Sequence, residues 1–383
     1  MSNTLTNLLP DMYEALDVVS REMTGFIPAV SRDSSVERAA VGQTVRVPVT
    51  PAASTATNTP GVTAPDTGDQ AIDNVSITIS KSKHVPVRWN GEETRGLRNA
   101  GTFSTIQADR FYQAMRALIN EIEADLWADA YTSASRAYGA AGTTPFGTAA
   151  EMSDFAGVLR ILEENGAPTN DLQLVLGHAA MANLRGKQSG LFKVNEAGSS
   201  DMLRNGMTDR IMGMAIRHSN AVSTHTKGTG ASYQTNNVAG YSVGSTTIAA
   251  DTGTGTVLAG DVVTFAADTA NKYVVNTAYS GGSLAIGGPG LRATVPDNNA
   301  ITVGNTYTAN VAFARSAIVL ATRAPAMPEG GDMAADVMTL VDDRTGLAFE
   351  VASYRQFLQV VYHVRLAWGY ATVASRHVGL LLG

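Results

Sequence analysis

The sequence contains no cysteine among its 383 residues. This absence excludes disulfide bonds, thiolate metal sites and cysteine nucleophiles within the chain. The chain also lacks a continuous apolar run of the roughly 20 residues that a membrane helix needs, so no membrane association is expected. Asp11, Glu14 and Asp17 stand where an export signal would need a basic start and an unbroken apolar stretch. We therefore expect a chain that is not exported.

Charged side chains are scarce as well. They make up 16% of the residues, compared with about 25% in average globular proteins. The 28 basic and 34 acidic side chains give a net charge of −6, so the chain lacks the basic field that nucleic-acid binding through phosphates requires. An apolar fraction of 44% is nevertheless typical of a globular chain with a large core. A surface that is mostly neutral predicts extensive contact between subunits.

Motifs that would support catalysis are not convincing. Two Asp-Thr-Gly tripeptides, at 66–68 and 251–253, resemble the paired triplets of aspartic proteases. Both lie in low-complexity stretches, where this tripeptide is ordinary turn chemistry. The six histidines show no pair at metal-ligand helical spacing with a carboxylate partner. We expect no enzymatic activity and no bound cofactor or metal.

Apolar periodicity predicts an arm and a hairpin in the first part of the chain. From residue 7 to 21, apolar residues recur at three- and four-residue spacing, as in a short amphipathic helix. Two later runs alternate apolar and polar residues as strands do; their apolar members are Val45, Val47, Val49, Val75, Ile77 and Ile79. Residues 50–73 between them hold three prolines and no lysine or arginine. A structureless loop of this length is uncommon inside a compact domain, so we predict a hairpin that extends away from the body.

A long helix is predicted next. Ser104 and Gln107 form a capping-box start, and one face then stays apolar as far as about Arg136. At 1.5 Å per residue, such a helix is about 45 Å long, which predicts an elongated molecule. Shorter helices are predicted at 152–165 and 178–185, with a strand at 172–176 between them.

Composition changes after residue 225. Residues 226–312 are rich in Gly, Thr, Val, Ala and Asn, and short β runs alternate there with Gly and Asn turns. This pattern predicts an inserted all-β domain. Mixed character returns at Phe313, with strands predicted at 317–321, 347–351 and 358–366. The predicted class is α+β, with a host domain interrupted by a β insertion.

The order of these elements resembles the major capsid protein of tailed bacteriophages, the Hong Kong ninety-seven-like fold. Gly213 to Ile216, Asp343 to Val351 and Leu366 to Gly369 resemble segments of that family. The β insertion is similar to the extra domain of the phage P-twenty-two branch of coat proteins. The resemblance implies these divisions: an N-terminal arm at 1–35, an extended loop hairpin and its base at 36–100, a spine helix and peripheral domain at 101–150, the first part of an axial domain at 151–225, the inserted all-β domain at 226–312, and closing axial and peripheral strands at 313–383.

The same resemblance implies function and partners. It implies a coat protein that self-assembles through hexameric and pentameric capsomers into an icosahedral shell around double-stranded DNA, which it contacts without sequence specificity. A separate scaffolding protein and a portal protein are the implied partners, the virion capsid is the implied location, and the host bacterial cytoplasm is the implied place of assembly. The prototype cross-links through a lysine in its extended loop. Because residues 50–73 contain none, covalent cross-links are not expected here.

Subunit contacts are the candidate functional residues. In the arm they are Leu8, Leu9, Met12 and Leu16; in the hairpin they are Val45, Val47, Val49, Val75, Ile77 and Ile79; at the hairpin base they are Arg88, Trp89, Glu92 and Glu93. The alternative is a secreted surface-layer or adhesin-like binding module, which the Gly-, Thr- and Asn-rich β segment suggests. A signal peptide would favour that alternative.

Overall fold

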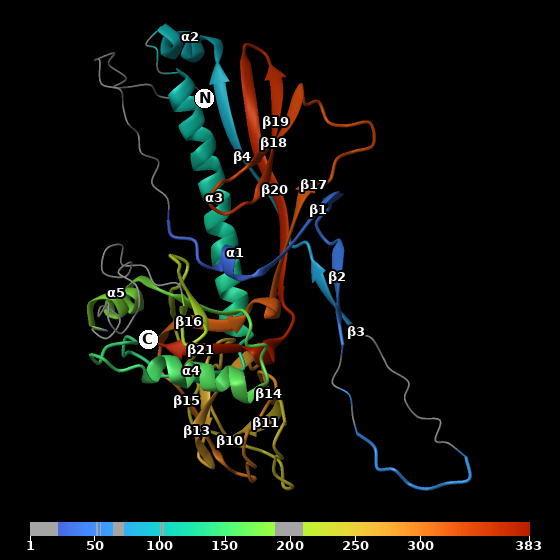
Figure 1. Ribbon diagram of the computed structural model, residues 1–383, viewed down its shortest axis with the longest axis vertical. Coiled ribbons are helices and arrows are strands. Elements are labelled where there is room, and N and C mark those ends of the chain that lie inside the picture. The colour runs from blue at the N-terminus through green and yellow to red at the C-terminus, as the bar shows by residue number, and fades with distance from the viewer. Residues whose placement is uncertain are drawn as a thin grey trace.

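The chain forms an elongated body built along one long helix, α3 (Phe103–Thr132), and a hairpin projects from the middle of this body (Figure 1). Figure 1 is a computed structural model. It describes residues 22–50, 53, 55–63, 73–99, 101, 103–187 and 210–383. The predicted arm helix, with Leu8, Leu9, Met12 and Leu16, lies outside the described residues.

The long helix is confirmed, but it ends earlier than predicted. Its inner face buries Ala114, Met115, Leu118, Ile119, Ile122, Leu126 and Ala130, at the spacing read from the sequence. Arg136, which was expected near the end of the helix, instead begins β5 (Arg136–Tyr138). This strand pairs in parallel with β21 (Val378–Leu382) at the far end of the chain. Tertiary pairing therefore decides where the helix stops.

One end of the body is a six-stranded sheet. Its strands are β1 (Ser31–Ala39), β4 (Lys81–Asn90), β17 (Ile318–Pro325), β18 (Asp336–Val341), β19 (Ala348–Gln356) and β20 (Gln359–Thr372). The order is β1-β17-β20-β19-β18, and β4 pairs with β20 along ten residue pairs. Three of these strands, β17, β19 and β20, confirm the strands predicted in the closing part of the chain. The short helix α2 (Gly91–Asn99) follows β4 at the tip of this lobe (Figure 1).

The other end contains a 13-stranded sheet in the order β12-β15-β10-β11-β14-β13-β5-β21-β16-β6-β8-β7, with β9 also paired to β16. Helices α4 (Ser153–Glu164) and α5 (His178–Lys187) lie in this part of the molecule, close to the two helices expected there. The further strands are β6 (Leu172–Leu176), β7 (Arg210–Ile211), β8 (Met214–His218), β9 (Thr224–His225), β10 (Tyr233–Thr235), β11 (Thr247–Asp251), β12 (Val262–Phe265), β13 (Asp268–Thr277), β14 (Ser283–Ile286), β15 (Ala300–Val303) and β16 (Tyr307–Ala314).

The β-rich segment has a hydrophobic cluster of its own, centred on buried side chains such as Val263, Phe265 and Tyr273. It is nevertheless continuous with the body, because β13 pairs antiparallel with β5. The boundary expected after Ala312 falls inside β16, which pairs with β6 and β21 of the body. The predicted limit therefore divides a strand that pairs with the body.

The hairpin consists of β2 (Thr44–Val49) and β3 (Asp73–Thr78), which pair antiparallel from Thr44↔Thr78 to Val49↔Asp73. This confirms the predicted pairing of the two alternating runs. The root of the hairpin packs in a small cluster with β17 and β20. Residues 55–63, farther along, are all exposed.

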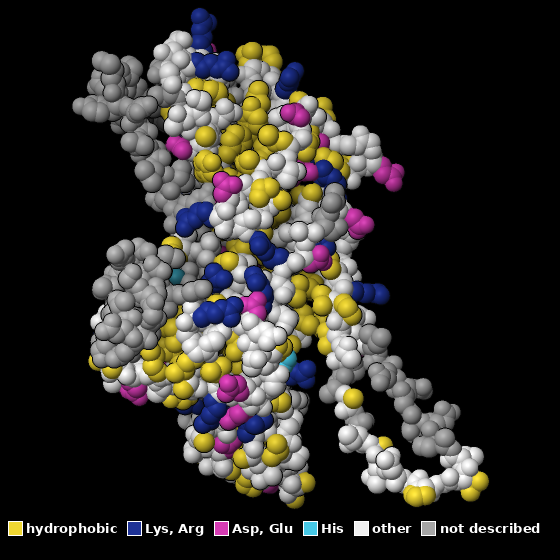
Figure 2. Space-filling view, in the orientation of Figure 1, with side chains coloured by type: hydrophobic (Ala, Val, Ile, Leu, Met, Phe, Trp, Pro, Cys, Tyr) yellow, Lys and Arg dark blue, Asp and Glu magenta, His cyan; other side chains and the backbone are white. Residues whose placement is uncertain are grey.

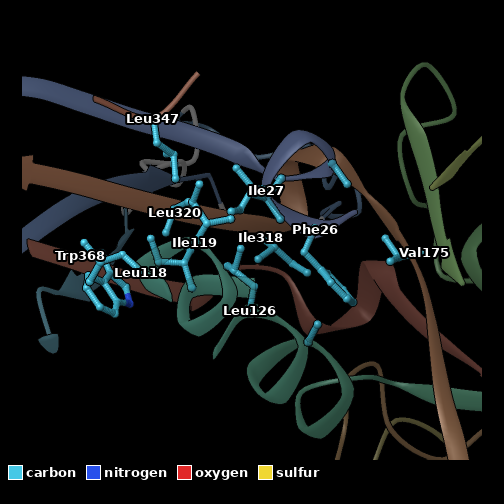
Figure 3. Packing of buried hydrophobic residues seen from close by; sticks show 14 of the residues in the cluster. Phe26, Ile27, Leu118, Ile119, Leu126, Val175, Ile318, Leu320, Leu347 and Trp368 are labelled. Carbon is cyan, nitrogen blue, oxygen red and sulfur yellow. The ribbon is translucent and has the colours of Figure 1, made fainter. Parts of the chain in front are cut away.

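The central core lies where the N-terminal segment crosses α3. Phe26 and Ile27 of the short helix α1 (Phe26–Ala29) are fully buried. Figure 3 shows them beside side chains of α3 and of β17, including Leu126 and Ile318. Segments from three distant parts of the sequence therefore share one core.

Candidate subunit-contact surfaces

Salt bridges hold the root of the hairpin against α3. Lys81 Nζ, at the start of β4, lies 2.8 Å from a carboxylate oxygen of Asp125 and 2.9 Å from one of Glu121. The indole Nε1–H of Trp368 donates to the other oxygen of Asp125 at 3.0 Å. Burial alone would lower the pKa of Lys81, but its hydrogen bonds to Asp125 and Glu121 raise it overall, so this amine stays charged. The hairpin thus leaves the body from a fixed base.

The tip of the lobe is organised by a capping box. The amide of Glu93 donates to the side-chain oxygen of Asn90 at 2.7 Å, and the amide of Asn90 donates to the Glu93 carboxylate at 3.1 Å. This reciprocal arrangement satisfies two otherwise unpaired donors at the start of α2. Next to it, Trp89 meets the ring of Phe103 edge-on at a centroid distance of 5.7 Å.

Four of the residues predicted to contact a neighbouring subunit are buried within their own chain. Ile77 and Ile79 are 0% exposed and pack within their own chain, and Trp89 and Glu93 are 7% and 6% exposed. Their side chains are used inside the subunit, because the hairpin root and the α2 cap need them. Val45, Val47, Val49, Val75 and Arg88 are half-buried and Glu92 is exposed, so these six remain candidates for contact with another chain.

A buried carboxylate that the sequence interpretation missed holds the N-terminal segment. Glu123 of α3 accepts hydrogen bonds from the amides of Gly25, Phe26 and Ile27 at 3.2, 3.1 and 2.8 Å, and from the Ser219 hydroxyl at 2.8 Å. Burial raises the pKa of Glu123, although these four donors oppose the shift. The available signal was its position on the apolar face of the helix, one residue after Ile122.

Two further polar groups fix the β-rich segment to the body. Asp261 is 1% exposed, and its carboxylate accepts from His225 Nε2 at 2.9 Å and from the amide of Leu258 at 2.7 Å. Arg136 is 2% exposed, and it bridges Asn271 of the segment at 2.9 Å and Glu164 of α4 at 2.8 Å. Buried charges are costly unless they are paired. These two networks therefore link the β-rich segment to the body through paired buried groups.

The described residues contain a sequence motif that hydrolases use, but in a different structural context. Residues 240–244 read Gly-Tyr-Ser-Val-Gly, which matches the nucleophile-elbow pattern by letter, but they lie between strands of the β-rich segment and not between a strand and a helix. Within the described ranges, no group of three or more His, Asp or Glu side chains could hold a metal ion. None of the described helices is long and apolar enough to cross a membrane. Asp251 ends β11, and Asp66 lies outside the described residues.

Comparison with known proteins gives a match in structure only. No family model matches the sequence, and no curated protein matches it. The capsid structure of the cyanophage P-SCSP1u is similar over 100% of this chain and 95% of that chain, with a TM-score of 0.51 and 13% identity. The chain has a phage capsid fold.

Other solved structures are similar at lower scores. Mycobacterium phage Che8 gives a TM-score of 0.48 at 14% identity, covering 99% of this chain and 98% of that one. The capsid of the native GTA particle gives 0.48 at 12% identity, covering 98% and 95%. The predicted α+β class, and the predicted resemblance to a phage capsid fold, are confirmed by the full-length cyanophage match.

Proposed function

We propose that this chain is the major capsid protein of a tailed bacteriophage, which self-assembles into an icosahedral shell around the double-stranded DNA genome. The observation that carries the proposal is the match to a cyanophage capsid structure, because it spans the whole chain, including the hairpin and the β-rich segment. The alternative of a secreted binding module gains no comparable support. The role is structural, and no catalysis is proposed.

The hairpin supports a role in assembly. Its outer residues 55–63 are exposed throughout, and Val62 shows 107% of its reference area. A two-stranded ribbon is marginally stable in water unless a third strand or another surface supports it. A neighbouring subunit provides that surface. The candidate contacts are Val45, Val47, Val49, Val75, Arg88 and Glu92, together with the arm residues Leu8, Leu9, Met12 and Leu16.

The proposed assembly has further members. Copies of the chain form hexameric and pentameric capsomers, a separate scaffolding protein directs their closure, and a portal protein occupies one vertex. Assembly takes place in the host bacterial cytoplasm, and the product is the virion capsid. The net charge of −6 fits a wall that contacts DNA without gripping its phosphates.

The test is expression of the full chain with a candidate scaffolding protein, followed by negative-stain electron microscopy. Uniform closed shells are expected. Monodisperse monomers at every concentration and with every scaffold would contradict the proposal.

A further inference from the structure

Among the described residues, three strands of the six-stranded sheet, β1, β4 and β18, pair on one side only. Among the described strands, β18 pairs only with β19 at one end, and β4 pairs only with β20 on the opposite side. We call residues 326–347, which include β18 and the loops on either side of it, the β18 flank. The β4 flank comprises β4, α2 and residues 103–112 of α3. The sheet itself separates the two flanks, so they cannot meet within one chain.

β18 has little of the usual protection of a sheet edge, since its one charged side chain is Asp336 at its start. Five of the six residues of β18 are exposed, and Val337, Met338 and Val341 are 40%, 57% and 54% exposed. Monomeric proteins blunt such edges with lysine, proline or a bulge, or cover them. The sequence of β18, Asp-Val-Met-Thr-Leu-Val, contains neither lysine nor proline, and its six pairs with β19 follow one register without a shift. Because side chains alternate along a strand, Val337 and Val341 point to one face of this edge and Met338 to the other. The edge therefore exposes apolar side chains on both faces.

The two flanks carry opposite charge. On the β18 flank, the exposed carboxylates of Glu329, Asp336 and Asp343 face solvent, with Arg344 as the exposed cation. Figure 2 shows acidic side chains on the loop that joins β17 to β18, and basic side chains over α2 at the tip.

The exposed cations of the β4 flank are Lys83 on β4, Arg95 and Arg98 on α2, and Arg110 on α3. Lys83 pairs with Glu121 of α3 at 2.6 Å, whereas the exposed anion within the flank is Glu92. Arg98 lies over the ring of Phe103 at 5.3 Å, so its guanidinium is held at the surface. Charge complementarity of this kind favours one partner and one orientation.

We propose that the β18 flank of one copy of this chain docks on the β4 flank of the next copy. The proposal rests on the proposed capsid function and specifies which surfaces join neighbours within a capsomer. Because two different surfaces meet, the contact is heterologous and repeats head to tail, and it closes into a ring when the rotation between copies allows closure. The docked neighbour covers Val337, Met338 and Val341, and its arginines face the carboxylates of the β18 flank.

Charge reversal tests this docking on the full chain. One variant carries Arg95→Glu and Arg98→Glu, a second carries Asp336→Lys and Asp343→Lys, and a third carries all four changes. Lys227→Glu, in the β-rich segment, is the control for a reversed exposed charge. All these side chains are exposed, and a thermal melt of each variant checks that it folds.

The readout is the fraction of protein in rings and shells, measured by sedimentation and negative-stain microscopy with the same scaffolding protein. Each two-residue variant is expected to lose about tenfold in assembly at low salt, and the four-residue variant to recover to within about threefold of the unaltered chain. The control is expected to assemble normally.

Two results would overturn the docking. Either the two-residue variants assemble as well as the unaltered chain, or the four-residue variant folds but stays unassembled. If the unaltered chain assembles in these experiments, the proposed function stands and only the docking is wrong. If the unaltered chain never assembles, the proposed function itself is wrong, and the docking falls with it.

Discussion

Glu123 shows how a single buried residue places a whole segment. Its carboxylate gathers three consecutive amides from residues 25–27 and a hydroxyl from Ser219, so the entering chain and the segment after β8 are both fixed to α3. Consecutive amides that point at one anion form a favourable concave site for negative charge. The residue is structural, and it fixes residues 25–27 against α3.

Replacing Glu123 with glutamine should destabilise the chain. Glutamine keeps the size of the side chain but turns an NH₂ group toward the amide donors, which leaves buried donors unsatisfied at a cost of about 1–3 kcal/mol. The free energy of unfolding in urea measures this loss, and proteolysis near residues 22–30 should become faster. The matched control is Glu163→Gln on α4, where the side chain is exposed; a change within about 0.5 kcal/mol is expected there. Equal effects of the two variants would contradict the prediction.

His218 should make stability depend on pH. Burial, followed by the charges of His178 and Arg185, lowers the pKa of His218 from 6.5 to about 4. Between these values the unfolded chain binds a proton that the folded chain does not, so stability falls as the pH drops from about 6.5 toward 4. The variant His218→Gln should show a weaker fall in melting temperature between pH 7 and pH 5. An unchanged slope would show that His218 does not contribute.

At the scale of elements, the position of the hairpin depends on the contacts at its base. β2 and β3 have few partners beyond their root, whereas Lys81, Asp125 and Trp368 tie the adjoining β4 to α3 and β20. Rigid bases of this kind position a mobile or extended element for contact with another molecule. Polar contacts at its root thus set the direction in which the hairpin leaves the body.

Asp125→Ala should weaken this base. It removes the acceptor of the buried Trp368 indole and one partner of Lys81, and an unsatisfied buried donor costs about 1–3 kcal/mol. Asp125→Asn can still accept from the indole, so we expect it to lose less. Asp109→Ala, on the same helix, is the control, and urea unfolding measures all three variants. A larger loss for the asparagine variant than for the alanine variant would contradict this account.

At the scale of the whole molecule, folding and assembly use different parts of the chain. The cores lie in the body, at its two ends and where α1 crosses α3, whereas the outer hairpin and β18 expose apolar side chains. Exposed apolar surface in a chain with 16% charged residues is typical of a protein that buries area between subunits.

Shortening the hairpin should therefore impair assembly without destabilising the folded chain. Because Val49 lies opposite Asp73, residues 50–72 can be replaced by Asn-Gly, a pair that forms a tight two-residue hairpin turn. The shortened chain should keep the melting temperature of the monomer within about 2 °C, since its cores are intact, and should form no closed shells. Thermal melts and negative-stain microscopy measure the two outcomes. Shells of normal yield would refute the assigned role of the hairpin.

The sequence by itself determined the local elements of this protein. Apolar spacing along α3 and the alternation in β2 and β3 depend on residues close together in the chain, so each could be predicted from its own segment. The change of composition after residue 225 likewise identified a β-rich region. The order of these elements was enough to predict a phage capsid fold.

The remaining features were decided by the tertiary structure, because they involve contacts between residues far apart in the sequence. Arg136 leaves the helix to pair with a strand 243 residues later, as the hydrogen bond between Ser135 and Val378 illustrates. Glu123 holds the N-terminal segment because the amides of residues 25–27 donate to it. Ile77 is buried because it packs against β17 and β20. The open edge of β18 was invisible to periodicity, since its residues alternate in the same way whether or not another strand lies beside them.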